Sequence, residues 1–278
     1  MTPTDRPARR RLGARLRELR ALRFRSGSAL AEHLGWVQSR VSKLETGAQL
    51  PSEADLDTWV AATGVGPDVR AELAELVMAA RLDYHIWSEA FARPGGIAAL
   101  QDAYAHKEAA ATRLATLTLS VIPGLLQTVA YATELLTVLG PMLGGDPAEV
   151  ASLVAARMRR QNVLYTPGKR IQMVIGEGAL RTWFGTPETL RGQRDRLVQA
   201  IDLPGVEIGI AAFGRPNPAP ALGEFALHDS DVVFVESLTG EQRIEAPDEV
   251  AVYVRAFEAA MAAAVTGADA AALIRSIT

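Results

Sequence analysis

Leucines recur at helical spacing from the start of the chain. Four of them return every three or four residues between positions 9 and 23 and share one helical face: Leu12, Leu16, Leu19 and Leu22. Further short amphipathic segments predict helices over residues 27–34, 38–46 and 53–63, and another that begins at Pro67, a residue suited to a first helical turn. The pattern therefore predicts a mainly α N-terminal domain of five helices.

The second and third of these helices have the spacing of a tight helical corner. Ser26 is suited to cap the second helix, and Gly35 can end it in a left-handed conformation at little steric cost. Ala31 supplies the small residue that a steep helix crossing needs. In the third helix, Val41 and Leu44 turn inward. Four polar side chains remain on its outer face: Gln38, Ser39, Arg40 and Lys43.

The segments LAEHLG at residues 30–35, VSKLETG at 41–47 and LPS at 50–52 resemble phage-repressor-type helix-turn-helix regulators of the xenobiotic-response-element class. The resemblance implies that the four outer side chains face the major groove of double-stranded DNA, where Arg and Lys suit guanine and Gln suits adenine. It also implies that Arg20 and Glu45 form a structural ion pair between the first helix and the end of the third. In isolation, Arg40 and Lys43 could equally solvate an exposed helix face.

Beyond residue 97, helical periodicity is mixed with strand-like segments. We expect helices over residues 97–119, from Pro123-Gly124 to 139, and over 147–164, 188–202 and 248–264. Runs typical of strands lie at residues 170–175, 206–212, 223–227 and 232–237, the last two joined by a tight turn. These elements predict an α+β C-terminal domain with a small, largely antiparallel sheet.

The helix pattern, the two family resemblances described here and the break at Pro94-Gly95-Gly96 divide the chain into three expected parts. Residues 1–9 are predicted to be a basic N-terminal tail, and residues 10–82 a helix-turn-helix DNA-binding domain. Residues 97–278 are predicted to be an α+β domain for regulation or partner binding. Pro94-Gly95-Gly96 mark a hinge or sharp corner before this last domain.

A second resemblance covers more of the chain. It rests on IPGLLQT at residues 122–128, RMRRQ at 157–161, Glu177 with ALR at 179–181, and GEF at 223–225. These segments resemble a large C-terminal domain without assigned activity, found behind helix-turn-helix modules in actinobacterial-type regulators. The resemblance implies regulation, often with a small partner protein encoded nearby.

Three polar residues of this domain lie one turn apart on a predicted helix: Arg157, Arg160 and Gln161. They could hold a carboxylate, a phosphate or an acidic partner surface, and thus contact a partner or effector. They could also pin Glu108 or Glu134 inside the fold. The residues themselves leave both roles open.

Charge is distributed unevenly along the chain. Residues 1–65 hold 11 Lys or Arg and 7 Asp or Glu, a net charge of +4, whereas the remainder carries −7. A basic N-terminal part on an acidic body suggests that only the former meets a polyanion. The absence of cysteine fits a reducing cytoplasm, and the first 25 residues hold nine Arg and no long apolar core of a secretory signal. We expect a cytoplasmic protein without a membrane partner.

The candidate chemistry favours a regulator over an enzyme. The histidines are scattered without metal-ligand spacing, and no nucleophile elbow or phosphate-binding glycine loop is present, so we expect no metal, cofactor or catalytic residue. The leading hypothesis is a sequence-specific transcriptional regulator that binds DNA as a homodimer, through the C-terminal domain or the fourth and fifth helices. The alternatives are an antitoxin-like module that sequesters a small partner encoded nearby, and a small-molecule sensor.

Overall fold

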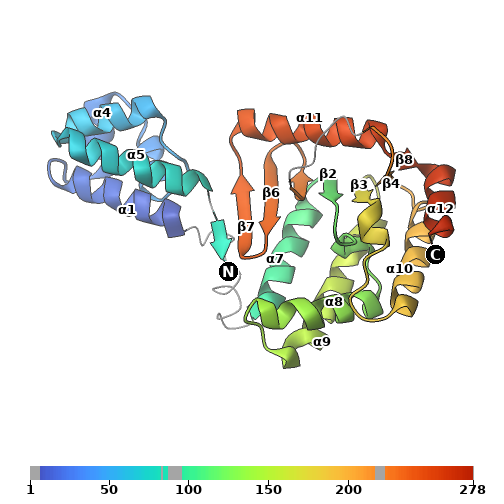
Figure 1. Cartoon of the computed structure of the whole chain (residues 1–278). Helices are drawn as coiled ribbons and strands as arrows, with labels where there is room; N and C mark the ends of the chain where they lie inside the picture. The colour runs from blue at the N-terminus through green and yellow to red at the C-terminus, as the bar shows by residue number, and fades with distance from the viewer. Residues whose placement is uncertain (1–6, 83, 87–95, 217–222, 278) are drawn as a thin grey trace. The chain divides into compact units, whose positions relative to one another are not determined.

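The computed structural model describes residues 7–82, 84–86, 96–216 and 223–277 (Figure 1). The chain divides into two compact units, residues 1–84 and 85–278. Most of the expected basic tail, residues 1–6, lies outside the described residues. So do Pro94 and Gly95 of the expected hinge.

The N-terminal unit is helical. It contains α1 (Pro7–Ala21), α2 (Gly27–Leu34), α3 (Gln38–Glu45), α4 (Glu53–Thr63) and α5 (Pro67–Leu82). Its core is formed by apolar residues that are almost fully buried, among them Leu12, Leu16, Leu30, Val41, Leu44 and Trp59. Leu22 does not join this core and is 69% exposed, because α1 ends at Ala21. The prediction of a helical N-terminal domain is confirmed.

The C-terminal unit mixes helices and strands. The helices are α7 (Gly96–Ala110), α8 (Val129–Met142), α9 (Val150–Arg160), α10 (Pro187–Ala200), α11 (Pro247–Ala263) and α12 (Gly267–Ser276). Short 3-10 turns lie at η1 (Gly124–Leu126), η2 (Pro147–Glu149), η3 (Gln161–Tyr165) and η4 (Glu177–Leu180). The strands are β2 (Arg113–Thr118), β3 (Arg170–Gly176), β4 (Val206–Ala211), β5 (Phe225–His228), β6 (Val232–Ser237), β7 (Gly240–Ile244) and β8 (Val265–Thr266). The α+β class is confirmed.

One mixed sheet runs through this unit in the order β1-β7-β6-β5-β2-β3-β4-β8, with the short β1 (Tyr84–Ile86) at its edge. The central strands β2, β3 and β4 are parallel, whereas β5, β6, β7 and β8 each pair antiparallel with a neighbour. The prediction of a small, largely antiparallel sheet was therefore wrong. The connections β2–β3 and β3–β4 contain helices, as parallel pairs require.

The missed strand β2 explains much of this error. A helix was expected over residues 97–119, but α7 ends at Ala110 and β2 begins at Arg113. Leu114 packs in the core on one face of the sheet, and Ala115 and Leu117 pack in the core on the other. A strand buried on both faces shows no alternation of polar and apolar residues, so it reads like a buried helix segment.

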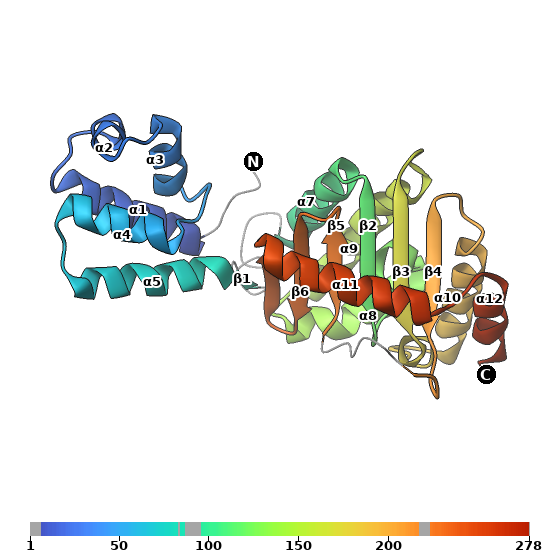
Figure 2. The same cartoon turned by 90° about the horizontal axis from the view of Figure 1, so that it is seen from above.

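Helices cover both faces of the sheet. Figure 2 shows α11 lying across one face, where its Val250, Phe257 and Ala260 pack on β2, β5 and β6. The opposite face is covered by α8, α10 and α12, whose apolar residues pack on Ile171, Met173 and Ile175 of β3. In the described part of the chain, no helix combines the length and apolar character needed to cross a bilayer.

Candidate nucleic-acid interface

Local capping determines where α2 ends and α3 begins. The Ser26 hydroxyl accepts a hydrogen bond from the Ala29 amide at 3.1 Å and starts α2. Gly35 then adopts φ 66°, which a glycine allows without steric cost, and ends the helix. The Trp36 amide donates to the Ala31 carbonyl at 2.8 Å, and α3 begins immediately after Val37. The two helices are thus joined by the short turn of residues 35–37.

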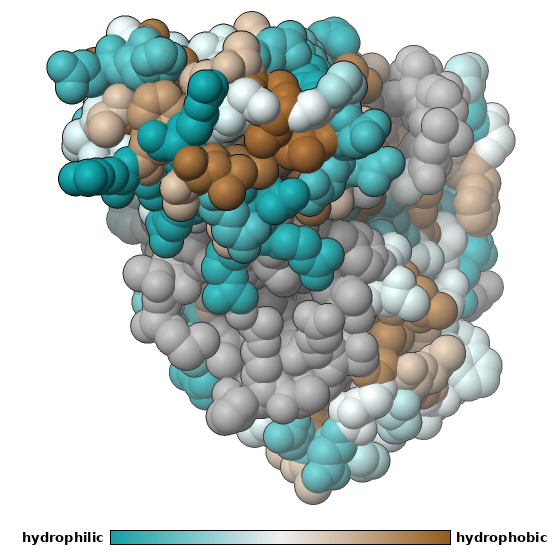
Figure 3. Space-filling view, turned by 90° about the vertical axis from the view of Figure 1, so that its left-hand side faces the viewer, coloured by the Kyte–Doolittle hydropathy of each residue, from teal (hydrophilic) through white to brown (hydrophobic). Residues whose placement is uncertain are grey.

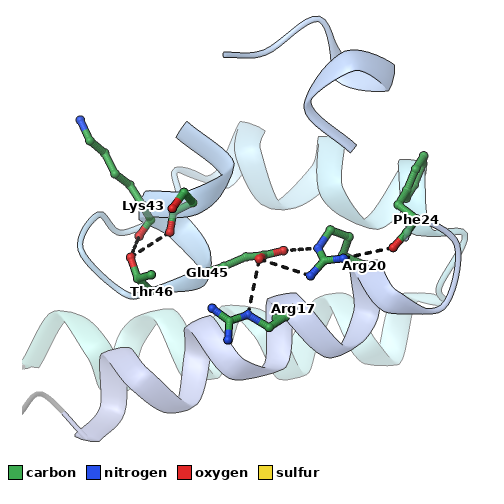
Figure 4. A network of polar contacts seen from close by, with 7 residues as sticks. Arg17, Arg20, Phe24, Lys43, Glu45 and Thr46 are labelled. Carbon is green, nitrogen blue, oxygen red and sulfur yellow. Dashed lines mark hydrogen bonds and ion pairs between the residues drawn. The ribbon is translucent and has the colours of Figure 1, made fainter. Parts of the chain in front are cut away.

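The third helix has one buried and one open side. Val41 and Leu44 are fully buried. Gln38, Ser39 and Lys43 are exposed, as the sequence pattern predicts for the outer face. Figure 4 shows the Lys43 side chain extending away from the polar network at the base of the helix. The outer side chains are therefore available to a large partner.

Arg40 differs from its neighbours because it already has partners within the unit. Its Nη2 donates to Asp55 Oδ1 at 2.6 Å, and its guanidinium lies 4.2 Å from the centroid of the Trp36 ring. The side chain nevertheless remains 41% exposed. Arg40 is thus held in one position at the edge of the outer face, a restraint that sequence reasoning missed.

Asp55 performs a second task at the start of α4. Its Oδ2 accepts from the Ser52 amide at 2.9 Å, and the Ser52 hydroxyl accepts from the Asp55 amide at 3.2 Å. This reciprocal pair is a capping box. One carboxylate therefore caps α4 with one oxygen and holds Arg40 with the other. The S-x-x-D spacing at residues 52–55 could have identified the cap, but no sequence signal links it to Arg40.

A buried ion pair fixes α3 against α1 (Figure 4). Arg20 donates through Nε to Glu45 at the end of α3, and its Nη1 donates to the Phe24 carbonyl at 3.1 Å. The side chains of Arg20 and Glu45 are only 10% and 8% exposed. Arg17 lies 3.5 Å from the same carboxylate but is 57% exposed. These groups bind one another and are positioned to orient α3.

Two glycines permit this close approach of α1 to the end of α3. A Cβ on Gly13 would lie 2.5 Å from the Glu45 carbonyl oxygen. A Cβ on Gly47 would lie 2.7 Å from the Arg9 carbonyl oxygen, and Gly47 also has φ +71°. Side chains at either position would collide with backbone atoms, so the spacing between the helices depends on both glycines.

Apolar side chains also reach the surface of the N-terminal unit. Figure 3 shows a face of this unit on which hydrophilic side chains surround an apolar area. Val37, directly before α3, is 68% exposed. An apolar group at this position can pack against a thymine methyl in the major groove. The sequence pattern placed Val37 only in the turn.

The three polar residues singled out in the C-terminal unit have different partners. The Gln161 amide donates to the carbonyls of Gly124 and Gln127, at 3.1 and 2.7 Å, and so pins the segment around η1. Arg160 Nε lies 2.9 Å from Glu108, one of the two carboxylates considered from the sequence. Arg157 Nη1 donates to the Gln127 side-chain oxygen at 2.7 Å. Arg157 and Arg160, but not Gln161, line a cavity of this unit.

Comparison with protein families divides the chain in the same way. Residues 11–73 match a family described as a helix-turn-helix domain. Residues 101–276 match a family described as a domain of unknown function, DUF5753. A search of curated proteins found no match.

Proposed function

The chain belongs to the DUF5753 family, and we propose that it is a sequence-specific transcriptional regulator that reads DNA with α3 of its helix-turn-helix domain. The observation that carries this proposal is the outer face of α3. Gln38, Ser39 and Lys43 are exposed on this face, while the base of the helix is fixed by the buried pair of Arg20 and Glu45. A rigid helix with free donors and acceptors on one side suits a major groove.

Each outer side chain has a role that its chemistry supports. Gln38 can bind an adenine edge through two hydrogen bonds, and Lys43 can donate to guanine or to a phosphate. Ser39 can donate to either base or backbone. Arg40 reaches guanine only by leaving Asp55, so DNA must compete with that carboxylate. We assign the module to the phage-repressor-like, xenobiotic-response-element type on these roles and on the segments quoted above.

We further propose that the protein acts as a homodimer in the cytoplasm. Two copies of α3 would then meet successive major grooves about 34 Å apart on a palindromic site. The exposed Met78 on α5, with 59% of its surface accessible, supports a self-contact that includes this helix. Light scattering on the purified chain tests the dimer, and a monomer at micromolar concentration would contradict it.

The test of DNA reading is selection of binding sites from random duplexes with the full-length chain, followed by footprinting. We expect one recurrent palindromic sequence. Gln38→Ala and Lys43→Ala should each weaken binding to it by about 1–3 kcal/mol. Arg255→Ala is the matched control for Lys43→Ala, because it removes the same charge from an exposed position on α11. If no sequence is enriched, or if both α3 variants bind like the control, the proposal is wrong.

A second candidate role is that of a small-molecule sensor, and the cavity beside Arg157 favours it. A small partner protein encoded nearby remains a prediction from the resemblance. Purification from the native host would retain such a partner and would distinguish it from a chain that isolates alone.

A further inference from the structure

A cavity of about 290 Å³ lies in the C-terminal unit, between the sheet and helices α7, α8 and α9. Its lining includes the apolar Leu135, Leu136 and Leu139 of α8. Charged side chains of α9 and of the hairpin β6–β7 also line it, among them Arg157 and Glu236. An apolar wall with a few convergent polar groups is the usual construction of a small-molecule site.

Among the described residues, no carboxylate lies within ion-pair distance of Arg157. The described residues give its guanidinium one hydrogen-bond partner, the neutral side-chain oxygen of Gln127, and leave Nε with none. Burial, together with the neighbouring Arg160, lowers the pKa of Arg157 to about 10. The guanidinium therefore stays charged at neutral pH, in surroundings where an unpaired charge is unfavourable.

Arg160 lines the same cavity and, unlike Arg157, has a carboxylate partner among the described residues. Arg160 has the Glu108 carboxylate 2.9 Å from its Nε, and its Nη1 donates to the Gln101 side-chain oxygen at 2.7 Å. Its charge is compensated within the fold. The contrast leaves Arg157 as the arginine that can receive an anion from outside.

Glu236 is the complementary anion. Within the described ranges, its carboxylate accepts no hydrogen bond and has no cation within ion-pair distance, although it lines the cavity. Its cross-strand neighbour Glu241 is buried and accepts instead from the Tyr104 hydroxyl. The Glu236 side chain is exposed to solvent at the end of β6. The protein atoms around its carboxylate nevertheless raise the pKa of Glu236, while Arg157 and Arg160 oppose that rise. A guanidinium and a carboxylate thus line one cavity without touching each other.

We propose that this cavity binds a small amphipathic zwitterion of the amino-acid type. Its carboxylate pairs with Arg157, its ammonium pairs with Glu236, and its apolar chain packs along Leu135, Leu136 and Leu139. Such a head satisfies both unpaired charges at once, which neither an acid nor an amine alone can do. The ligand's role as an effector rests on the proposed regulator function. The binding of the ligand to the cavity does not, and it can be measured by itself.

The test uses the full-length chain without DNA and three probes that share one apolar chain: 2-aminooctanoate, octanoate and octylamine. Titration calorimetry should show one site for 2-aminooctanoate. Octanoate and octylamine should each bind roughly tenfold or more weakly, because each leaves one charged group unpaired. Equal binding of the three probes, or no binding of 2-aminooctanoate, overturns the proposal.

Variants assign the two contacts. Glu236→Gln breaks no hydrogen bond or ion pair among the described residues and should reduce 2-aminooctanoate affinity to about that of octanoate, with octanoate binding unchanged. Arg157→Gln should reduce it to about that of octylamine. Arg159→Gln is the matched control, because this arginine is exposed on the same helix. If Glu236→Gln leaves 2-aminooctanoate affinity unchanged, the assignment is wrong. Since DNA is absent, this result is independent of the site-selection experiment.

Discussion

Replacement of Arg20 by glutamine tests whether the buried ion pair holds α3 in place. Removal of one partner from a buried pair costs about 3–5 kcal/mol, because the other charge is left uncompensated. Both side chains are at most 10% exposed, so this range applies. Arg17 remains 3.5 Å from Glu45 in the variant and offsets part of the loss. We therefore expect about 3 kcal/mol of destabilisation, the lower end of that range.

Hydrogen exchange measured by mass spectrometry on the full-length chain is the suitable assay, because it reports on α1 and α3 separately from the C-terminal unit. A loss of 3 kcal/mol accelerates exchange through unfolding by roughly a hundredfold in these helices. Arg17→Gln is a matched control, since it removes an exposed arginine from the same carboxylate and should cost about 0.5 kcal/mol. Exchange in Arg20→Gln no faster than in Arg17→Gln would refute the reasoning.

Further substitutions probe other features. Gly13→Ala should destabilise the N-terminal unit by about 1–3 kcal/mol, seen in urea unfolding, because the new Cβ meets the α3 backbone at 2.5 Å. Gly192→Ala, with open space around it in α10, should instead stabilise by up to about 1 kcal/mol. Asp55→Asn should raise affinity for the selected DNA site more than Asp57→Asn, an equal charge change on α4, because only the former releases Arg40. Equal effects of the two would contradict this. Burial raises the pKa of Glu241 to about 7 in the folded chain, so its stabilising contribution is present below pH 4.5 and is lost as the pH rises through 7. Glu241→Gln should accordingly become more stable relative to the unchanged chain over that interval, by about 3 kcal/mol in total, and a pH-independent difference in calorimetric unfolding would show the carboxyl to be unperturbed.

The helices of the N-terminal unit could be predicted from the sequence because each carries its own local signals. Ser26 and Gly35 bound α2, and buried residues such as Val41 and Leu44 recur at helical spacing. Local signals of this kind do not depend on distant parts of the chain.

The sheet could not be predicted in the same way. The strand β2 is buried on both faces and lacks alternation, and β7 reads as polar because its GEQRI sequence contains Glu241. That residue is only 2% exposed and lines the cavity. A buried polar residue in a strand breaks the local pattern, and such conflicts concentrate at functional sites.

The candidate sites also depend on tertiary contacts that local sequence patterns do not reveal. The outer residues of α3 follow from helix periodicity, but the pairing of Arg40 with Asp55 joins residues 15 positions apart through the tertiary fold. Likewise, the sequence presents Arg157 and Arg160 as equivalent. Because α7 packs beside α9, Glu108 pairs with Arg160, whereas Arg157 has only the neutral Gln127 as a hydrogen-bond partner among the described residues.

The double use of Asp55 bears on how this module diverges among relatives. Loss of Arg40 leaves the Asp55 carboxylate still bonded to the Ser52 amide, so α4 keeps its start. Loss of the Asp55 carboxylate removes the acceptor of the Ser52 amide and the anchor of Arg40 together, and leaves only the bond from the backbone amide of residue 55 to the Ser52 hydroxyl. Under the proposed DNA-reading role, position 40 can therefore change with the target sequence, whereas position 55 is constrained by folding. Relatives with this role should differ on the outer face of α3 and retain an acidic residue at position 55.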